Sequence, residues 1–91
     1  MYFVYILTNK NNTVLYIGIT NDLARRLWQH KTCSTDSFTQ RYRATKLVYY
    51  EVVEDVRSAI QREKRLKKWN RSWKKELIGK TNPNWEEIKI M

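Results

Sequence analysis

Cysteine, glycine and proline are scarce in this 91-residue chain, which contains one, two and one of them, respectively. The single cysteine, Cys33, cannot form an internal disulfide, and it indicates a reducing compartment. With so few glycines and prolines, most of the chain is expected to lie in regular helices and strands. The length fits one domain over residues 1–91, and the 13% share of aromatic residues argues against intrinsic disorder.

Long apolar runs are also missing from the sequence. An apolar run over residues 2–7 has no basic residues before it, so it is not expected to be a signal peptide. No run approaches the ~20 apolar residues that span a bilayer. We therefore expect a soluble, cytoplasmic protein with no membrane partner, and we infer no obligate protein partner.

Acidic residues are outnumbered: nine Asp and Glu stand against 18 Lys and Arg, which gives a formal net charge of +9. An excess this large in a short chain favours a polyanionic partner, with nucleic acid first. Basic residues alternate with tryptophans after Glu63, where Lys64 and Lys67 are expected to contact a phosphate backbone. The alternative is a solvated charged face on which Trp69 and Trp73 serve helix packing.

Two runs of β-branched and aromatic residues, 2–8 and 13–19, flank an asparagine-rich segment and predict a β-hairpin. If the loop is residues 9–12, paired positions sum to 21 and Tyr5 stands directly opposite Tyr16. A slip of one residue would place the two tyrosines on opposite faces of the hairpin.

The rest of the chain predicts helices around a third strand. Asn21 or Asp22 is the expected N-cap of a helix that runs to about Lys31. Arg26 and His30 lie four residues apart on this helix, so they project together from the margin of its apolar stripe. The remaining expected elements are a loop, a strand, two helices and a last turn, over residues 32–45, 47–53, 55–70, 72–79 and 82–88.

Glu63 falls in the middle of the apolar face of the second predicted helix, among Val56, Ala59, Ile60 and Leu66. A carboxylate in such a place must be paired, bound to a metal or located at the wall of a cleft. The structural alternative to a functional role is a salt bridge to an arginine at the edge of the core.

Several kinds of catalytic site are excluded: the chain has no P-loop, no glycine-rich dinucleotide motif and no Cys/His zinc cluster. The groups that remain suit phosphodiester hydrolysis, in which a tyrosine near a cation can position or deprotonate the attacking water. Arg26 can clamp a phosphate oxygen, His30 can relay a proton, and Glu63 can hold a divalent ion. These groups are expected to line one concave site: Tyr5, Tyr16, Arg26, His30 and Glu63.

The chain resembles the GIY-YIG nuclease superfamily in five features that occur in order: Phe3-Val4-Tyr5, Tyr16-Ile17-Gly18, Arg26, His30 and Glu63. The second motif is intact, whereas the first has Phe3 and Val4 in place of glycine and isoleucine. Arg26 lies ten residues after Tyr16, where the family has its catalytic arginine, and Glu63 matches the metal-binding glutamate. The chain most resembles the small stand-alone bacterial proteins of this superfamily.

The resemblance implies an α+β fold, with a three-stranded antiparallel sheet flanked by helices in the order ββαβαα. It also implies a metal-dependent endonuclease that uses one Mg²⁺ or Mn²⁺ ion on Glu63, acts on DNA more than RNA, and serves DNA repair or recombination. Asn82 is the candidate match for an asparagine that the family has near its C-terminus. The residues expected to contact substrate are Gly18, Arg25, Lys64 and Lys67.

Two other functions compete with catalysis. A non-catalytic module could bind nucleic acid on the same scaffold, and an adaptor could use the tryptophan-rich surface to bind protein. Retention of both tyrosines, Arg26 and Glu63 favours catalysis, because a binding module has no need of a carboxylate facing a phosphate.

Overall fold

The computed structural model describes residues 1–32 and 42–90 and has the predicted α+β architecture. One antiparallel sheet has the strand order β2-β1-β3, which makes β1 the central strand. Cys33 and most of the predicted 32–45 loop lie outside the described residues. The strands and helices are β1 (Tyr2–Thr8), β2 (Leu15–Thr20), α1 (Leu23–Thr32), β3 (Lys46–Val53), α3 (Val56–Lys68) and α4 (Arg71–Thr81).

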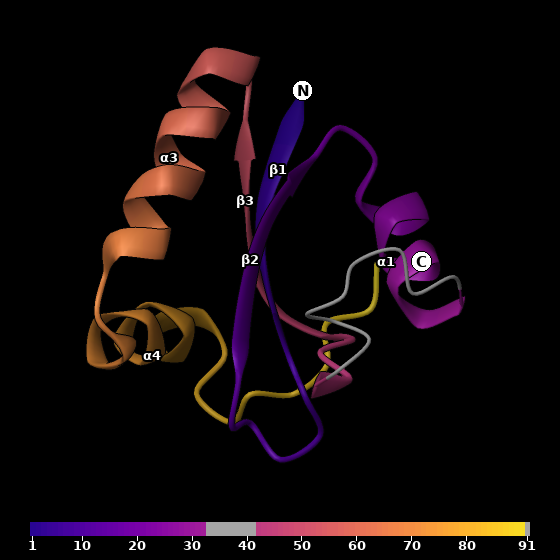
Figure 1. The fold of residues 1–91 in the computed structure, drawn as a ribbon, viewed down its shortest axis with the longest axis vertical. Coiled ribbons are helices and arrows are strands. Elements are labelled where there is room, and N and C mark those ends of the chain that lie inside the picture. The colour runs from indigo at the N-terminus through magenta and orange to yellow at the C-terminus, as the bar shows by residue number, and fades with distance from the viewer. Residues whose placement is uncertain (33–41, 91) are drawn as a thin grey trace.

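Helices cover both faces of the sheet. The α3 and α4 helices lie on one face, while α1 and the C-terminal segment lie on the other (Figure 1). Side chains alternate along β1, so Val4 and Ile6 pack toward α3, whereas Tyr5 and Leu7 pack toward α1. The core is therefore divided into two layers by its central strand. Within the described part of the chain, every helix is too short or too polar to cross a bilayer.

Side-chain caps begin α1, α3 and α4, as the sequence predicted for the first of them. The carboxylate or amide oxygen of each cap accepts a hydrogen bond from the backbone amide three residues further on. The cap of α1 is Asp22 rather than Asn21, and the caps of α3 and α4 are Asp55 and Asn70.

The register of the β1–β2 hairpin differs from the prediction by two residues. Tyr5 pairs with Gly18, so paired positions sum to 23, and the prediction that Tyr5 directly opposes Tyr16 is wrong. A shift of two residues preserves the alternation of faces along a strand. Tyr5 and Tyr16 therefore still project from the same face, as diagonal neighbours.

A longer loop causes this shift. The last pair of the hairpin is Thr8 with Leu15, which leaves residues 9–14 as the connection. Asn9 supports it, because its side-chain oxygen accepts a hydrogen bond from the Thr13 amide at 2.8 Å. The Thr13 amide, and the Val14 amide at 3.4 Å, therefore bond to Asn9 within the loop instead of extending the ladder between the strands.

The predicted last helical turn over residues 82–88 is wrong, because in the described structure this segment forms a turn and then packs beside β3 (Figure 1). The Asn82 side chain donates to the Val48 carbonyl at 3.1 Å and accepts from the Glu86 amide at 3.0 Å. The Ile88 amide donates to a β3 carbonyl at 2.8 Å. Asn82 thus anchors the C-terminal segment, which gives this candidate family residue a structural role.

Candidate active site

Tyr5 and Tyr16 project from adjacent strands on the sheet face that α1 covers, with ring centroids 6.4 Å apart. The Tyr5 ring crosses directly over Gly18. A Cβ atom at Gly18 would lie 2.5 Å from Tyr5 Cζ, which is much closer than non-bonded atoms approach. Gly18 is buried, so the residue predicted to contact substrate instead makes room for the Tyr5 ring.

The α1 helix adds Arg26 and His30 to the tyrosines. Arg26 Nε donates a hydrogen bond to the Tyr5 hydroxyl at 3.3 Å, and His30 Nε2 lies 3.1 Å from the same oxygen. The His30 ring also packs edge-on against Tyr16, with centroids 5.5 Å apart. Tyr5 and His30 are buried, at 0% and 2% exposure. The structure therefore brings together four of the five groups that the sequence predicted to meet.

The charge on Arg26 is held in place by this cluster. The hydrogen bond to Tyr5 raises the pKa of Arg26 above its ordinary value, although burial of the guanidinium acts in the opposite direction. Tyr16 raises the pKa of Arg26 further. A permanent cation beside a phenol oxygen stabilises negative charge on that oxygen. The negatively charged phenolate is the form of tyrosine that can accept a proton from water.

A surface cavity of about 670 Å³ adjoins the cluster at Arg26. The walls come from α1, from the end of β2 with the residues that follow it, and from the start of α3. Its lining includes Asp22, Arg25, Arg26, Gln29, Val56 and Ile60. Arg26 therefore connects Tyr5, Tyr16 and His30 to an open space, and Arg25 is exposed at the same wall.

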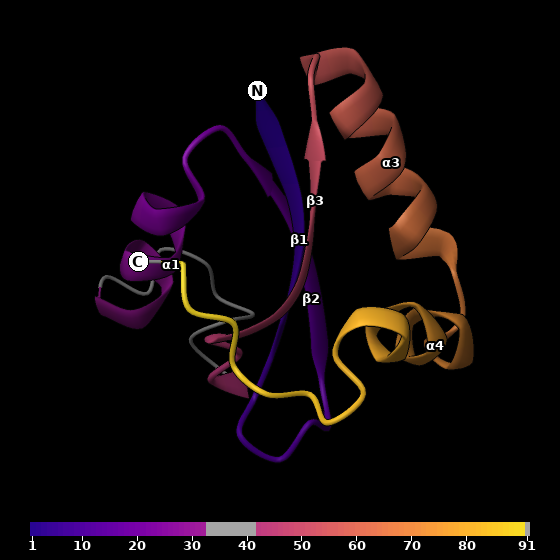
Figure 2. The same cartoon turned by 180° about the vertical axis from the view of Figure 1, so that it is seen from behind.

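Glu63 does not share this face of the sheet. It lies on α3, which covers the face opposite the one from which Tyr16 projects (Figure 2). The prediction that one concave surface holds all five groups is therefore wrong for Glu63. The physical reason is that helical periodicity shows which side chains share a helix face, but not which sheet face the helix covers.

The α3 helix nevertheless points Glu63 toward the β2 edge of the sheet. Val56 and Ile60 line the cavity, and Glu63 follows them on the same flank of α3, seven and three residues further on. Arg62 occupies the other flank and reaches Glu51 on β3, at the opposite edge of the sheet. A substrate that reached both Arg26 and Glu63 would pass around the β2 edge.

The surroundings of Glu63 are less apolar than the sequence predicted. Its side chain is 17% exposed and forms an ion pair with Lys67 at 3.5 Å. Val56 and Ile60, which were expected to be buried around it, are 45% and 40% exposed. The alternative of a bridge to an arginine is also not what forms, because Arg62 pairs with Glu51 instead.

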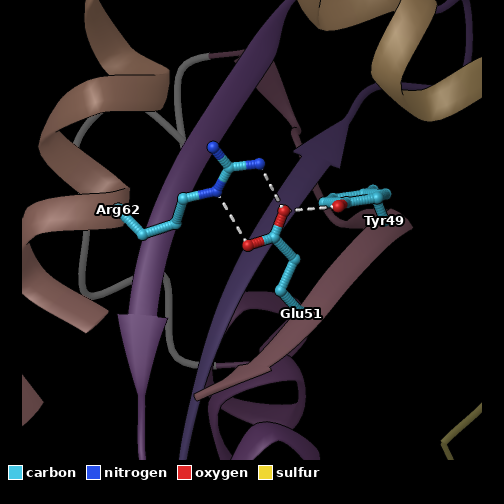
Figure 3. Close-up of polar contacts among 3 residues, drawn as sticks. All are labelled: Tyr49, Glu51 and Arg62. Atoms are coloured by element: carbon cyan, nitrogen blue, oxygen red, sulfur yellow. Dashed lines mark hydrogen bonds and ion pairs between the residues drawn. The ribbon is translucent and has the colours of Figure 1, made fainter. Parts of the chain in front are cut away.

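The network of Tyr49, Glu51 and Arg62 was not predicted from the sequence. Arg62 donates two hydrogen bonds of 2.8 Å to the Glu51 carboxylate, and the Tyr49 hydroxyl donates a third (Figure 3). Alternation along β3 places Tyr49 and Glu51 on the face that α3 covers. A carboxylate at a core-facing strand position was the available signal, and it required a partner from a distant element.

Glu51→Gln is expected to lower the free energy of unfolding by about 1–2 kcal/mol near pH 7, because it removes a charged partner of Arg62. Burial raises the pKa of Glu51, but hydrogen bonds from Arg62 and Tyr49 outweigh burial and hold this pKa below its ordinary value of 4.5. The stabilisation that ionised Glu51 provides by pairing with Arg62 is therefore complete above about pH 4.5 and is lost as the pH falls through the lowered pKa.

Urea melts of both proteins near pH 7 and near pH 3 test this expectation, and the difference between them should shrink at the lower pH. Glu76→Gln, at an exposed position on α4, is the matched control and should change stability by less than about 0.5 kcal/mol. A difference between wild type and Glu51→Gln that does not vary with pH would contradict the assigned role.

Comparison with known proteins places this chain in a family. The GIY-YIG catalytic domain model matches residues 1–76. The chain is 40% identical over 79 residues to the UPF0213 protein of Clostridium perfringens, covering 87% of this chain and 84% of that protein. It is 37% identical over 82 residues to the UPF0213 protein of Syntrophus aciditrophicus, covering 89% and 92%, respectively.

A solved structure has a similar fold. The solution NMR structure of the UPF0213 protein from Bacillus halodurans matches with a TM-score of 0.59 and 26% sequence identity. The match covers 94% of this chain and 92% of that one. The strands and helices described above are thus shared with a relative over nearly the whole chain.

Proposed function

Because the chain belongs to the GIY-YIG catalytic domain family, we propose that it is a metal-dependent endonuclease that hydrolyses phosphodiester bonds in nucleic acid, preferably DNA. The observation that carries the proposal is the hydrogen bond that Arg26, at the wall of the cavity, donates to the buried Tyr5 hydroxyl. A phosphodiesterase needs a fixed cation beside a group that can take a proton, and this contact supplies both.

Each residue of the cluster has a part in this proposal. Arg26 uses Nε to hold Tyr5, and its Nη1 donates to Gln29 Oε1 at 3.5 Å, so we assign the remaining N–H groups of the guanidinium to a phosphate oxygen. Tyr5 or Tyr16 positions the attacking water and accepts its proton. His30, in hydrogen-bond contact with Tyr5, relays that proton.

The residues available for a metal suit Mg²⁺ or Mn²⁺ held mainly by substrate and water. Among the described residues no three His, Cys, Asp or Glu side chains gather into a metal site. Mg²⁺ is commonly bound through one or two carboxylates together with substrate phosphates, so Glu63 at the β2 edge is the ligand we propose. When bound, such an ion neutralises charge that develops on the phosphate.

A cleavage assay tests the proposed function directly. Single-stranded, duplex and branched DNA and RNA would be incubated with Mg²⁺, Mn²⁺ or EDTA, and cleavage is expected with the metals only. Arg26→Ala should slow cleavage roughly 10²- to 10³-fold, as expected for loss of a charge-stabilising group. Lys10→Ala, in the exposed hairpin loop, is the control. Absence of products from every substrate would refute the proposal.

Nucleic-acid affinity is expected to fall steeply with salt. The protein has a net charge of +9, and its basic side chains would displace counterions when they bind the phosphates. The slope should be roughly 0.7–0.9 log units of affinity per log unit of salt for each phosphate neutralised. Titrations at several salt concentrations in EDTA measure it without cleavage. A flat dependence would mean that the basic residues serve another purpose.

The second candidate function is a non-catalytic module that binds nucleic acid. The location of Glu63 on the helix that covers the opposite sheet face favours it, as does the altered first motif, with Phe3 and Val4. Salt-dependent binding without cleavage under any metal condition would support this function and exclude the first.

We propose that the protein works in the cytoplasm, in DNA repair or recombination. The single cysteine suits a reducing compartment. An endonuclease that acts on DNA inside the cell has its natural use in such processing. Localisation of a tagged protein, and the sensitivity of a deletion strain to DNA damage, would test the two statements separately.

A further inference from the structure

The positive charge of the protein is concentrated on the face away from the tyrosine cluster. Residues 56–81 contain ten Lys and Arg but only two Asp and Glu, so they hold eight of the nine excess positive charges. These residues form α3 and α4, which lie together on one face of the sheet (Figure 1). A polyanion is therefore drawn to this face as well as to Arg26.

An exposed tryptophan stands at the corner between these two helices. Trp73 is 54% exposed although it is a large aromatic residue, and its ring lies edge-on to Trp69 with centroids 5.8 Å apart. Basic residues near it in the sequence are exposed as well. We call this surface the tryptophan corner, made of Lys67, Lys68, Trp69, Arg71, Trp73 and Lys75.

The rings of the tryptophan corner are held by the ion-pair network. The Arg62 guanidinium stacks over Trp69, with its carbon 5.3 Å from the ring centroid. Glu51 accepts two hydrogen bonds from that guanidinium, so a strand of the sheet fixes the orientation of the Arg62 side chain (Figure 3). Trp73 therefore packs against a ring that is itself fixed, which lowers the entropy lost when a ligand stacks on it.

The two helices are also tied to each other and to the hairpin. Lys74 Nζ donates to the Lys67 carbonyl at 3.5 Å, and Arg71 donates to the Asn12 carbonyl at 3.1 Å. The ends of the two helices are thus held together, and this surface combines exposed cations with an exposed aromatic ring. Surfaces of this kind bind single-stranded nucleic acid, because cations track the phosphates while an unpaired base stacks on the ring.

We propose that the tryptophan corner binds a single-stranded nucleic-acid segment, with one unpaired base stacked on Trp73. The bases of a duplex are already stacked on each other, so this site distinguishes single strands from duplexes. The inference rests on the proposed function only in taking nucleic acid as the substrate. It adds that the preferred substrate has an unpaired segment outside the site of cleavage.

Binding measured in EDTA tests this site separately from cleavage. Fluorescence anisotropy with a labelled oligothymidylate, and with a duplex of equal length, would compare wild type with Trp73→Ala, Trp73→Phe and Trp28→Ala. Trp73→Ala should weaken binding of the oligothymidylate roughly 5- to 100-fold and leave duplex affinity nearly unchanged. Trp73→Phe should retain much of the affinity, because it keeps a ring that can stack.

Trp28→Ala is the matched control, since Trp28 is 60% exposed on α1, on the other side of the sheet. It should bind both ligands as wild type does. Unchanged binding of the oligothymidylate by Trp73→Ala, or an equal loss for single strand and duplex, would overturn the proposal, and an acidic protein would then be the better occupant. Because no metal is present, failure of the nuclease proposal would leave these results intact.

Discussion

Glu63→Gln is expected to lose metal-dependent cleavage by roughly 10³-fold or more, since a metal contributes several kcal/mol of charge stabilisation. Nucleic-acid affinity should remain or rise slightly, because a negative charge near the phosphates has been removed. Folding should be retained, since the amide is nearly isosteric with the carboxylate. Cleavage rates, binding curves and thermal melts of the purified variant measure the three quantities.

The experiment distinguishes a metal-binding role of Glu63 at the β2 edge from a purely structural role. Glu76→Gln removes the same charge from an exposed site on α4 and is expected to leave all three quantities close to wild type. If Glu63 serves instead as a structural partner of Lys67, its variant should melt at lower temperature and still cleave. That result would remove Glu63 from the catalytic machinery.

Gly18→Ala is expected to lower the free energy of unfolding by about 3 kcal/mol, at the upper end for an overpacked core. The added Cβ would lie 2.5 Å from Tyr5 Cζ, and Tyr5 is buried, so its ring cannot swing into solvent. The displaced phenol would also leave Arg26 and His30, so cleavage should fall with stability. Urea melts and cleavage rates measure both effects.

Gly79→Ala is the matched control for this substitution. Gly79 lies within α4, and a Cβ there meets no atom of the described residues within 4 Å. The change should therefore stabilise the protein by about 0.5–1 kcal/mol, as alanine does in a helix. Wild-type stability in Gly18→Ala would show that Tyr5 does not lie across Gly18.

A double-mutant cycle identifies the atoms responsible. If the clash with Tyr5 causes the loss, Gly18→Ala should cost much less when Tyr5 has already been replaced by alanine. The coupling free energy between the two positions should exceed about 1 kcal/mol, as expected for residues in contact. Additive effects would place the strain elsewhere.

Sequence periodicity was sufficient for the elements and for part of the site. The alternation along residues 2–8 and 13–19 predicted two strands, and the pair Arg26 and His30 followed from helical spacing alone. The prediction that Tyr5 and Tyr16 share a face survived a register error of two residues, because strand faces repeat every second residue. These features depend on neighbours within a few positions along the chain.

Only the tertiary structure revealed three other features: the register of the hairpin, the path of the C-terminal segment and the environment of Glu63. Hydrogen bonds of Asn9 lengthened the hairpin loop, and those of Asn82 tied the end of the chain to β3. In both cases a polar side chain offered the backbone a partner that competed with regular secondary structure. The sequence contains these asparagines but does not show which partners they reach.

By itself, the sequence determined the α+β class, the family and the cluster around Tyr5, because each rests on local spacing and on residue types in a given order. Only the tertiary structure decided that α3 covers the opposite sheet face, that Arg62 pairs with Glu51, and that Gly18 admits the Tyr5 ring. Those contacts join residues far apart in sequence, and packing of whole elements against each other selects them. For function, the most important consequence of this packing is that Glu63 lies at the β2 edge.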